Sequence, residues 1–117
     1  MKIDVTKDML HAKKEYTDSR NLVEEACEMY KDRIAYSFRK KASDKEKVEI
    51  PFTKVRDDVR ALTTELLARG YYGKKIIIYG ENSLEWATVF LSLVCGLAVA
   101  VTVDKDIDAE KLAKSLS

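Results

Sequence analysis

Apolar residues recur with helical periodicity in some stretches of the chain and alternate, or run without interruption, in others. The helical stretches are residues 21–30, 53–69, 86–95 and 107–116. The strand-like stretches are residues 34–38, 48–52, 75–79 and 97–103. Strands that alternate with helices are typical of the α/β class, and we expect the chain to hold part of a three-layer fold of that class.

The first two strand-like stretches are separated by a short charged run. Residues 34–38 alternate and are rich in aromatic side chains, and Pro51 closes the second stretch because proline cannot donate to a sheet. We therefore predict a β-hairpin over about residues 34–52, with residues 39–47 as its solvated tip. The basic residues of the tip would suit a phosphate or a nucleic acid, but two acids interrupt them and no aromatic side chain is available for base stacking.

Residues 75–103 have the pattern of a strand, a helix and a second strand. The run 75–79 is continuous, apolar and rich in isoleucine, which is typical of a parallel strand covered on both faces. In the second strand, Val99, Val101 and Val103 alternate with smaller residues. We predict two parallel strands that are flanked by helices and joined by a right-handed crossover.

The uncharged run 86–103 approaches the length of about 20 residues that a membrane-spanning helix needs. Gly96 divides it into a helical half and an alternating half. Acidic residues such as Glu85 and Asp104 flank the run, without the basic cluster that fixes the orientation of a membrane span. We therefore predict a buried helix that leads into a buried strand, and no transmembrane segment.

Polar residues and a glycine predict where the helices begin and end. Gly70 suits a left-handed C-cap after residues 53–69. Asn82 followed by Glu85 resembles a capping box. The other predicted N-caps are Ser19 or Asn21 for the first helix, Thr53 for the second and Asp108 for the last.

The composition is that of a folded protein without a strong charge field. The chain has 117 residues, of which 46% are hydrophobic and 35% charged, and a net charge of +1. Disorder and non-specific nucleic-acid binding are therefore disfavoured, and we expect no nucleic-acid partner. Cys27 and Cys95 lie among apolar residues, and no secretory leader is recognisable, so we expect two buried free thiols in a cytoplasmic protein.

Acidic residues alternate near the end of the chain, at Asp104, Asp106, Asp108 and Glu110. This alternation is similar to the start of a calcium-binding EF-hand loop. Such a loop would need glycine where the chain has Ala109. We interpret the acids instead as favourable neighbours of a helix N-terminus.

Two further features resemble parts of ligand sites. Gly80 lies where a strand meets a helix N-terminus, but Glu81 beside it disfavours an anion, and no phosphate-loop motif is present. His11 has Asp8 and Glu15 at helical offsets, which is a poor ligand set for a metal. The sequence therefore predicts no catalytic, cofactor-binding or metal-binding residue in this chain.

Three short motifs follow one another at a characteristic spacing. They are Gly73-Lys74-Lys75, the turn Gly80-Glu81-Asn82-Ser83-x-Glu85-Trp86, and Val101-Thr102-Val103-Asp104-Lys105. Over about residues 21–116 the chain resembles the N-terminal region of AMP-forming acyl-CoA synthetases, which belong to the acyl-adenylate-forming superfamily. The resemblance is strongest to bacterial long-chain fatty acid–CoA ligases, with a departure at Thr102, where that family usually has proline.

Residues 1–20 are of mixed charge with few apolar residues, and we predict that they form an N-terminal arm. The resemblance implies that residues 21–117 are the incomplete N-terminal part of the large adenylate-forming domain. The parent enzyme would use ATP, Mg²⁺ and coenzyme A to make acyl-CoA through an acyl-adenylate. The ATP loop, the ribose and magnesium motifs and the catalytic lysine of the family have no counterpart here. The resemblance therefore implies an inactive scaffold fragment whose partner is the remainder of the parent chain.

The residues alone leave a different function open, that of a stand-alone small α/β interaction module. Such a module would bind a protein partner through an open sheet edge. A downstream Ser/Thr/Gly-rich loop ending in lysine would favour the ligase, whereas a natural stop codon after Ser117 would favour the module. In the scaffold interpretation, unpaired strand edges also predict self-association.

Overall fold

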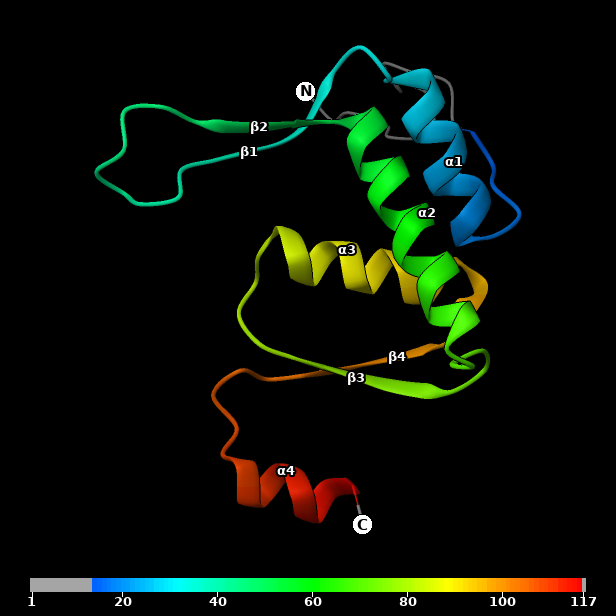
Figure 1. Cartoon of the computed structure of the whole chain (residues 1–117), viewed down its shortest axis with the longest axis vertical. Helices are drawn as coiled ribbons and strands as arrows, with labels where there is room; N and C mark the ends of the chain where they lie inside the picture. Colours follow the sequence, from blue (N-terminus) through cyan, green and yellow to red (C-terminus); the bar gives the residue numbers. More distant parts are fainter. Residues whose placement is uncertain (1–13, 117) are drawn as a thin grey trace, which may run out of the picture.

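The computed structural model describes residues 14–116, in which helices and strands alternate along the chain (Figure 1). The elements are α1 (Ser19–Met29), β1 (Ile34–Phe38), β2 (Val48–Pro51), α2 (Phe52–Ala68), β3 (Lys75–Tyr79), α3 (Leu84–Ser92), the π-helical turn η1 (Leu93–Leu97), β4 (Val99–Val103) and α4 (Ala109–Leu116). They form a mixed α/β fold with one antiparallel hairpin and one parallel pair of strands, which confirms the predicted fold class. His11, Asp8 and most of the predicted N-terminal arm lie outside the described residues.

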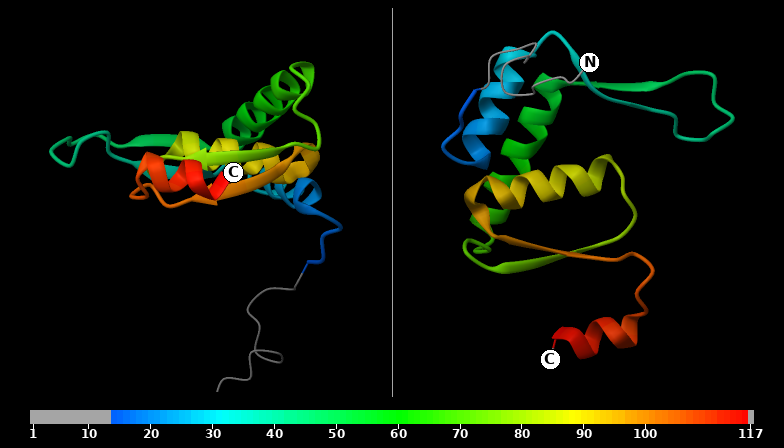
Figure 2. Two further views of the ribbon diagram at one scale, coloured as in Figure 1. Left: turned by 90° about the horizontal axis from the view of Figure 1, so that it is seen from below. Right: turned by 180° about the vertical axis from the view of Figure 1, so that it is seen from behind.

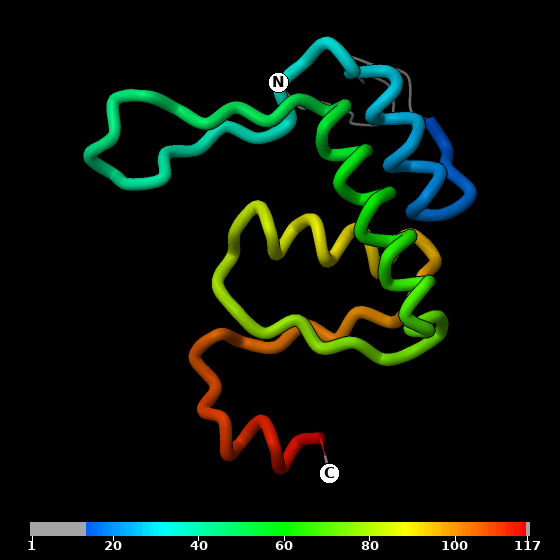
Figure 3. Tube along the Cα trace, in the orientation of Figure 1, coloured from blue at the N-terminus to red at the C-terminus, as the bar shows by residue number. Residues whose placement is uncertain are grey.

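The predicted hairpin is formed by β1 and β2. The strands pair antiparallel from Ile34 with Pro51 to Phe38 with Val48, with an irregularity near Tyr36. The loop between them projects away from the helices, as the Cα trace shows (Figure 3). Only the base of the hairpin is buried, where Ile50 joins a cluster with two valines of α2.

The two predicted strands of residues 75–103 pair in parallel as β3 and β4. The register of the pair runs from Lys75 opposite Val99 to Tyr79 opposite Val103. Ile78 is buried against η1, whereas Val99 points away from that cluster and is 53% exposed. The two faces of the pair therefore differ, because α3 and η1 cover only one of them. The helix α4 lies on the opposite side from α3 but has no buried residue (Figures 1 and 2).

The helix α2 crosses the end of α3, and this crossing joins the two halves of the fold (Figure 1). Ser92 is fully buried at the crossing, where its hydroxyl donates to the carbonyl of Thr88 at 2.7 Å and its Oγ lies 3.5 Å from the carbonyl of Val59. Beside it, Leu93 and Leu97 are 0% and 2% exposed and form the centre of the core with Ile78.

Trp86 lies on α3 at the edge of this core. Its ring stacks on that of Phe90, with the centroids 5.4 Å apart, and both side chains pack against the cluster around Leu93. Trp86 is only partly buried. It lies in the first turn of α3, next to the exposed residues 81–83 and 85.

The observed N-caps of α1 and α3 differ from the predicted ones. Asp18 caps α1, and its side chain accepts a hydrogen bond of 2.7 Å from the backbone N–H of Asn21, so the prediction of Ser19 or Asn21 is wrong. Ser83 caps α3 by accepting from the backbone N–H of Trp86 at 3.1 Å, so the prediction of Asn82 is also wrong. Both observed caps have the extended backbone that a cap requires.

The predicted cap of α2, Thr53, is wrong for a different reason. The helix begins one residue earlier, at Phe52, whose N–H donates to the carbonyl of Arg33 at the base of the hairpin at 3.1 Å. Pro51 is the N-cap and makes no side-chain cap. The hairpin therefore determines where this helix starts.

The predicted ends at Gly70 and Asp108 are confirmed. Gly70 has a φ of 84°, and the N–H groups of Gly70 and Tyr71 donate to the carbonyls of Leu67 and Leu66, which is a Schellman motif. At α4, the Asp108 carboxylate accepts from the backbone N–H of Lys111 at 2.8 Å.

The junction between α3 and β4 differs from the expected direct passage at Gly96. The helix α3 ends at Ser92, and a π-helical turn follows in which Gly96 has a φ of 98°. The strand β4 therefore begins at Val99, two residues later than predicted. Among the described residues, every helix is too short or too polar to cross a membrane.

We expect Gly96→Ala to lower the free energy of unfolding by about 1–2 kcal/mol, because a Cβ makes positive φ unfavourable. No atom within 4 Å would obstruct the new methyl group, so the cost would come from the backbone alone. Gly80→Ala is the matched control, since Gly80 lacks a positive φ and has equally open surroundings. Urea unfolding of both variants tests this: equal midpoints would contradict it.

Candidate functional site

A cleft of about 490 Å³ lies at the carboxyl ends of β3 and β4. Such ends, next to the N-terminus of a following helix, are where open α/β sheets bind ligands. The cleft is formed by the turn after β3, the first turn of α3 and the loop after β4. Its lining residues are Gly80, Glu81, Asn82, Trp86, Val103, Asp104 and Lys105.

The charges of this cleft largely neutralise one another. The Nζ atom of Lys105 lies 3.5 Å from a carboxylate oxygen of Glu81. Asp104 adds a second negative charge, and its side chain accepts from the backbone N–H of Asp106 at 2.9 Å. The cleft therefore has an excess of acid, which agrees with the prediction that Glu81 disfavours an anion near Gly80.

The titratable side chains of the cleft are already engaged: Glu81 pairs with Lys105, and Asp104 accepts from a backbone N–H. The hydroxyl of Ser83 is used as the helix cap. Within residues 14–116, no group of three His, Cys, Asp or Glu side chains could hold a metal ion. Two of the acids after β4 accept from backbone N–H groups instead: Asp104 holds a turn and Asp108 caps α4.

A second groove, of about 690 Å³, lies between α1, α2 and η1. Its floor is apolar and its rim is charged. The lining residues are Arg20, Val23, Glu24, Val59, Arg60, Thr63, Thr64, Leu67, Tyr72, Cys95, Gly96 and Leu97. Sequence reasoning missed this groove because its walls come from three separate segments, and periodicity places Arg60 and Glu24 on solvent-facing sides of two different helices.

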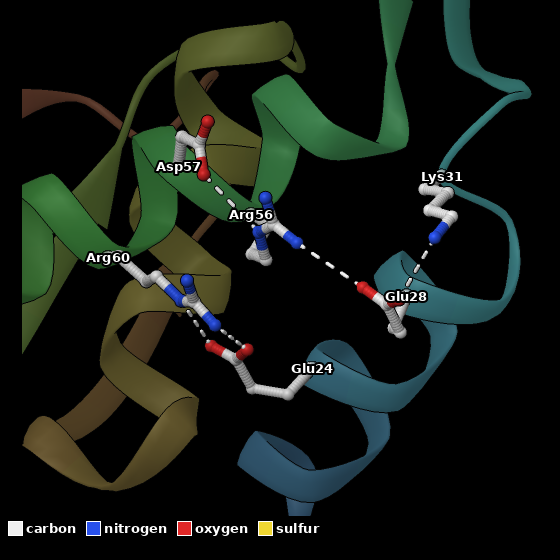
Figure 4. A network of polar contacts seen from close by, with 6 residues as sticks. All are labelled: Glu24, Glu28, Lys31, Arg56, Asp57 and Arg60. Atoms are coloured by element: carbon white, nitrogen blue, oxygen red, sulfur yellow. Dashed lines mark hydrogen bonds and ion pairs between the residues drawn. The ribbon is translucent and has the colours of Figure 1, made fainter.

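Ion pairs connect α1 to α2 (Figure 4), and the pair of Arg60 with Glu24 lies on the rim of this groove. The guanidinium of Arg60 binds both carboxylate oxygens of Glu24, in part through a hydrogen bond of 2.8 Å from Nε. Arg56 lies 3.6 Å from Glu28, which Lys31 contacts at 3.2 Å. The hydrogen bond from Arg60 is the main reason why the pKa of Glu24 lies below its ordinary value, although partial burial acts in the opposite direction.

The two cysteines have different positions around the groove. Cys27 is 3% exposed, as predicted, but Cys95 is only partly buried because it follows the end of α3 and lines the groove. Both thiols are free. Burial raises the pKa of each thiol, so both are expected to be protonated near neutral pH.

Comparison with known proteins finds solved structures that share the fold of this chain, but no match to its sequence. No protein-family model and no curated protein sequence matches it. Among solved structures, the anthranilate CoA ligase AuaEII in complex with anthranoyl-AMP is 17% identical, with a TM-score of 0.68 over 86% of this chain and 18% of that chain. CmiS6 is 15% identical, with a TM-score of 0.72 over 91% of this chain and 26% of that chain. The chain thus shares a fold with a minor part of each of these larger proteins.

We expect the Arg60–Glu24 pair to make the stability of the fold depend on pH. A lowered folded-state pKa of Glu24 means that its contribution is complete above about pH 4.3, the pKa of a free glutamate, and is lost as the pH falls through the folded-state value. The pair is partly exposed, so the effect should stay below about 1 kcal/mol. Urea unfolding between neutral and acid pH should show a shallower acid loss for Glu24→Gln than for the parent.

A double-mutant cycle provides the control for this prediction. Arg60→Gln should flatten the acid loss to a similar extent, and combining it with Glu24→Gln should add little, because either change removes the same pair. Fully additive effects of the two substitutions would show that the carboxylate and the guanidinium are not coupled.

Proposed function

We propose that the chain is the N-terminal scaffold of an AMP-forming acid–thiol ligase that joins a fatty acid to coenzyme A. The observation that carries this proposal is the fold shared with the anthranilate CoA ligase over 86% of this chain. The motifs Gly80–Trp86 and Val101–Lys105, which border the cleft at the strand ends, agree with it independently, because they resemble the same superfamily.

The reaction of such a ligase has two steps. In the first, a carboxylate oxygen of the fatty acid attacks the α-phosphorus of ATP, and pyrophosphate leaves with the formation of an acyl-adenylate. In the second, the thiol sulfur of coenzyme A attacks the acyl carbonyl, loses its proton, and releases AMP. Both steps transfer a group to a nucleophile and need no oxidant or reductant.

The part of this chain in that reaction is structural. The cleft residues do not fit a triphosphate, because Glu81 already neutralises Lys105 and Asp104 adds a negative charge. No step of the reaction is therefore assigned to them. The described residues would instead supply a parallel strand pair and its covering helices, and the groups that hold ATP, Mg²⁺ and coenzyme A would lie elsewhere in the parent protein.

The fatty acid specificity rests on the sequence resemblance alone. It is tested with the complete product of the source gene, by acid-dependent exchange of pyrophosphate into ATP. We propose that fatty acids support this exchange, whereas anthranilate, the acid of the structural relative, does not. Pyrophosphate exchange with aromatic acids only would support the ligase class but overturn the fatty acid specificity. Exchange with neither, or a gene without a Ser/Thr/Gly-rich loop that ends in lysine, would overturn both.

For the 117-residue chain alone, we expect no specific binding of Mg-ATP, since it holds no phosphate-cradling loop. Calorimetric titration is the direct measurement. One-to-one binding with micromolar affinity would mean that the cleft at Gly80 accepts a nucleotide after all, and the scaffold role would then be wrong.

A specific observation also favours the second candidate, an interaction module. Within residues 14–116, β3 pairs only with β4, so each strand has one unpaired edge, and Val99 and Tyr79 are 53% and 48% exposed. Free N–H and C=O groups beside exposed apolar side chains favour pairing with another chain. The module would be supported over the scaffold if the source gene ends after Ser117 and the chain pairs its strand edge with an unrelated protein.

We expect the isolated chain to self-associate through this strand pair, so that light scattering gives a mass above 13.3 kDa that rises with concentration. Val99→Lys should shift the equilibrium toward the monomer, because a charge opposes apolar association at that position. Tyr72→Lys is the control, at a residue that is 70% exposed but lies outside the sheet. A monomer up to about millimolar concentration would contradict open edges.

A further inference from the structure

The tip of the β1–β2 hairpin concentrates positive charge. It contains five basic and two acidic residues between positions 39 and 47, although the whole chain has a net charge of only +1. The basic residues are Arg39, Lys40, Lys41, Lys45 and Lys47, and all are exposed. Within residues 14–116, none of their side chains forms an ion pair, whereas Lys54 and Arg60 on α2 pair with neighbouring carboxylates.

The hairpin tip is ordered by one of its acids. The carboxylate of Asp44 accepts from the backbone N–H of Lys41 at 3.0 Å, and the backbone N–H of Asp44 donates to the carbonyl of Lys41, also at 3.0 Å. Asp44 is partly buried by this turn, while the lysines around it remain exposed. The turn therefore uses the negative charge internally and leaves the positive charges to face solvent.

The position of the tip suits contact with a large surface. Among residues 14–116, the hairpin extends away from the helices, so its tip can touch a surface before the helices do (Figures 1 and 2). Phe38, at the end of β1, is 37% exposed beside the cations. An aromatic side chain next to basic residues is a combination that favours the interface of an anionic bilayer.

We propose that the hairpin tip, residues 39–47, binds the anionic surface of a membrane peripherally. A bilayer surface attracts clustered cations without a shaped groove, whereas a single strand stacks successive bases on several aromatic side chains, and residues 39–47 have only the neighbouring Phe38. A pocket of about 530 Å³ does lie beside the start of the tip, but Glu85 lines it together with Arg39 and Lys40, so its charge is mixed and suits an acidic protein partner less well than the uniformly exposed cations suit a bilayer. This inference does not depend on the proposed ligase function, because it uses only the charge and the position of the hairpin.

Sedimentation of the chain with vesicles tests the proposal. Each basic residue near an anionic surface strengthens binding about fivefold, so a local charge of +3 predicts about hundredfold stronger binding to vesicles with about 30% phosphatidylserine than to pure phosphatidylcholine. Raising the salt from about 0.05 M to about 0.5 M should abolish the difference, because the screening length falls to a few ångströms. Equal binding to the two kinds of vesicle would overturn the proposal.

Two triple variants separate the hairpin from the charge of the whole chain. Lys40→Gln, Lys45→Gln and Lys47→Gln together should reduce binding to the phosphatidylcholine level. Lys31→Gln, Lys54→Gln and Arg69→Gln together remove the same charge from exposed, ion-paired positions, and should leave binding within about threefold of the parent. Circular dichroism confirms that both variants fold. Equal losses in the two variants would show that binding follows net charge and not the tip.

Two further arms identify the anion. If about 10 mM inorganic phosphate displaces the chain at constant ionic strength, the tip binds free phosphate groups and the membrane is the wrong partner. If a single-stranded oligonucleotide binds more tightly than the vesicles, the partner is a nucleic acid and the proposal fails. Retention on the vesicles in both arms supports a lipid surface.

Discussion

The contact of α2 with the end of α3 is the constraint on which the rest of the fold depends. Ser92 makes it feasible, because a small side chain allows two helices to approach closely and its hydroxyl donates to the carbonyl of Thr88 within its own helix, with the carbonyl of Val59 on α2 only 3.5 Å away. Immediately after it, Leu93 and Leu97 fill the space between the helices and β3. The hairpin, through Ile50, and the strand pair, through Ile78, therefore share one support although they do not contact each other extensively.

Strong local patterns were enough to predict most of the elements. The apolar run 75–79 and the stripe from Val55 to Leu67 give β3 and α2 almost to the residue, because both patterns reflect burial of one continuous segment. Helix ends were less predictable. At α2, a hydrogen bond from Phe52 to the distant Arg33 decides where the helix starts, and no local pattern contains that information. At α3, two adjacent polar residues could each act as cap, and only the backbone geometry selects Ser83.

The two candidate sites also differ in how far the sequence predicts them. The cleft at the strand ends could be located from sequence, since Gly80 follows a strand and precedes a helix, and its charge balance could be inferred from Glu81. The groove with Cys95 could not, because the approach of α1 to η1 is a property of tertiary packing. The comparison with solved structures relates only the fold: the strand pair and helices of this chain match a minor part of two larger proteins.

The attachment of α4 has a consequence for how the fold opens. Its described contacts with the sheet are sparse: the hydroxyl of Tyr79 donates to the carbonyl of Ile107 at 2.6 Å just before the helix, and no residue of α4 is buried. Local opening of α4 therefore exposes little apolar surface and requires little free energy, whereas opening of α2 disrupts both core clusters. The backbone amides of the two helices belong to separate cooperative units, so α4 can exchange its hydrogens with solvent while the crossing at Ser92 stays closed.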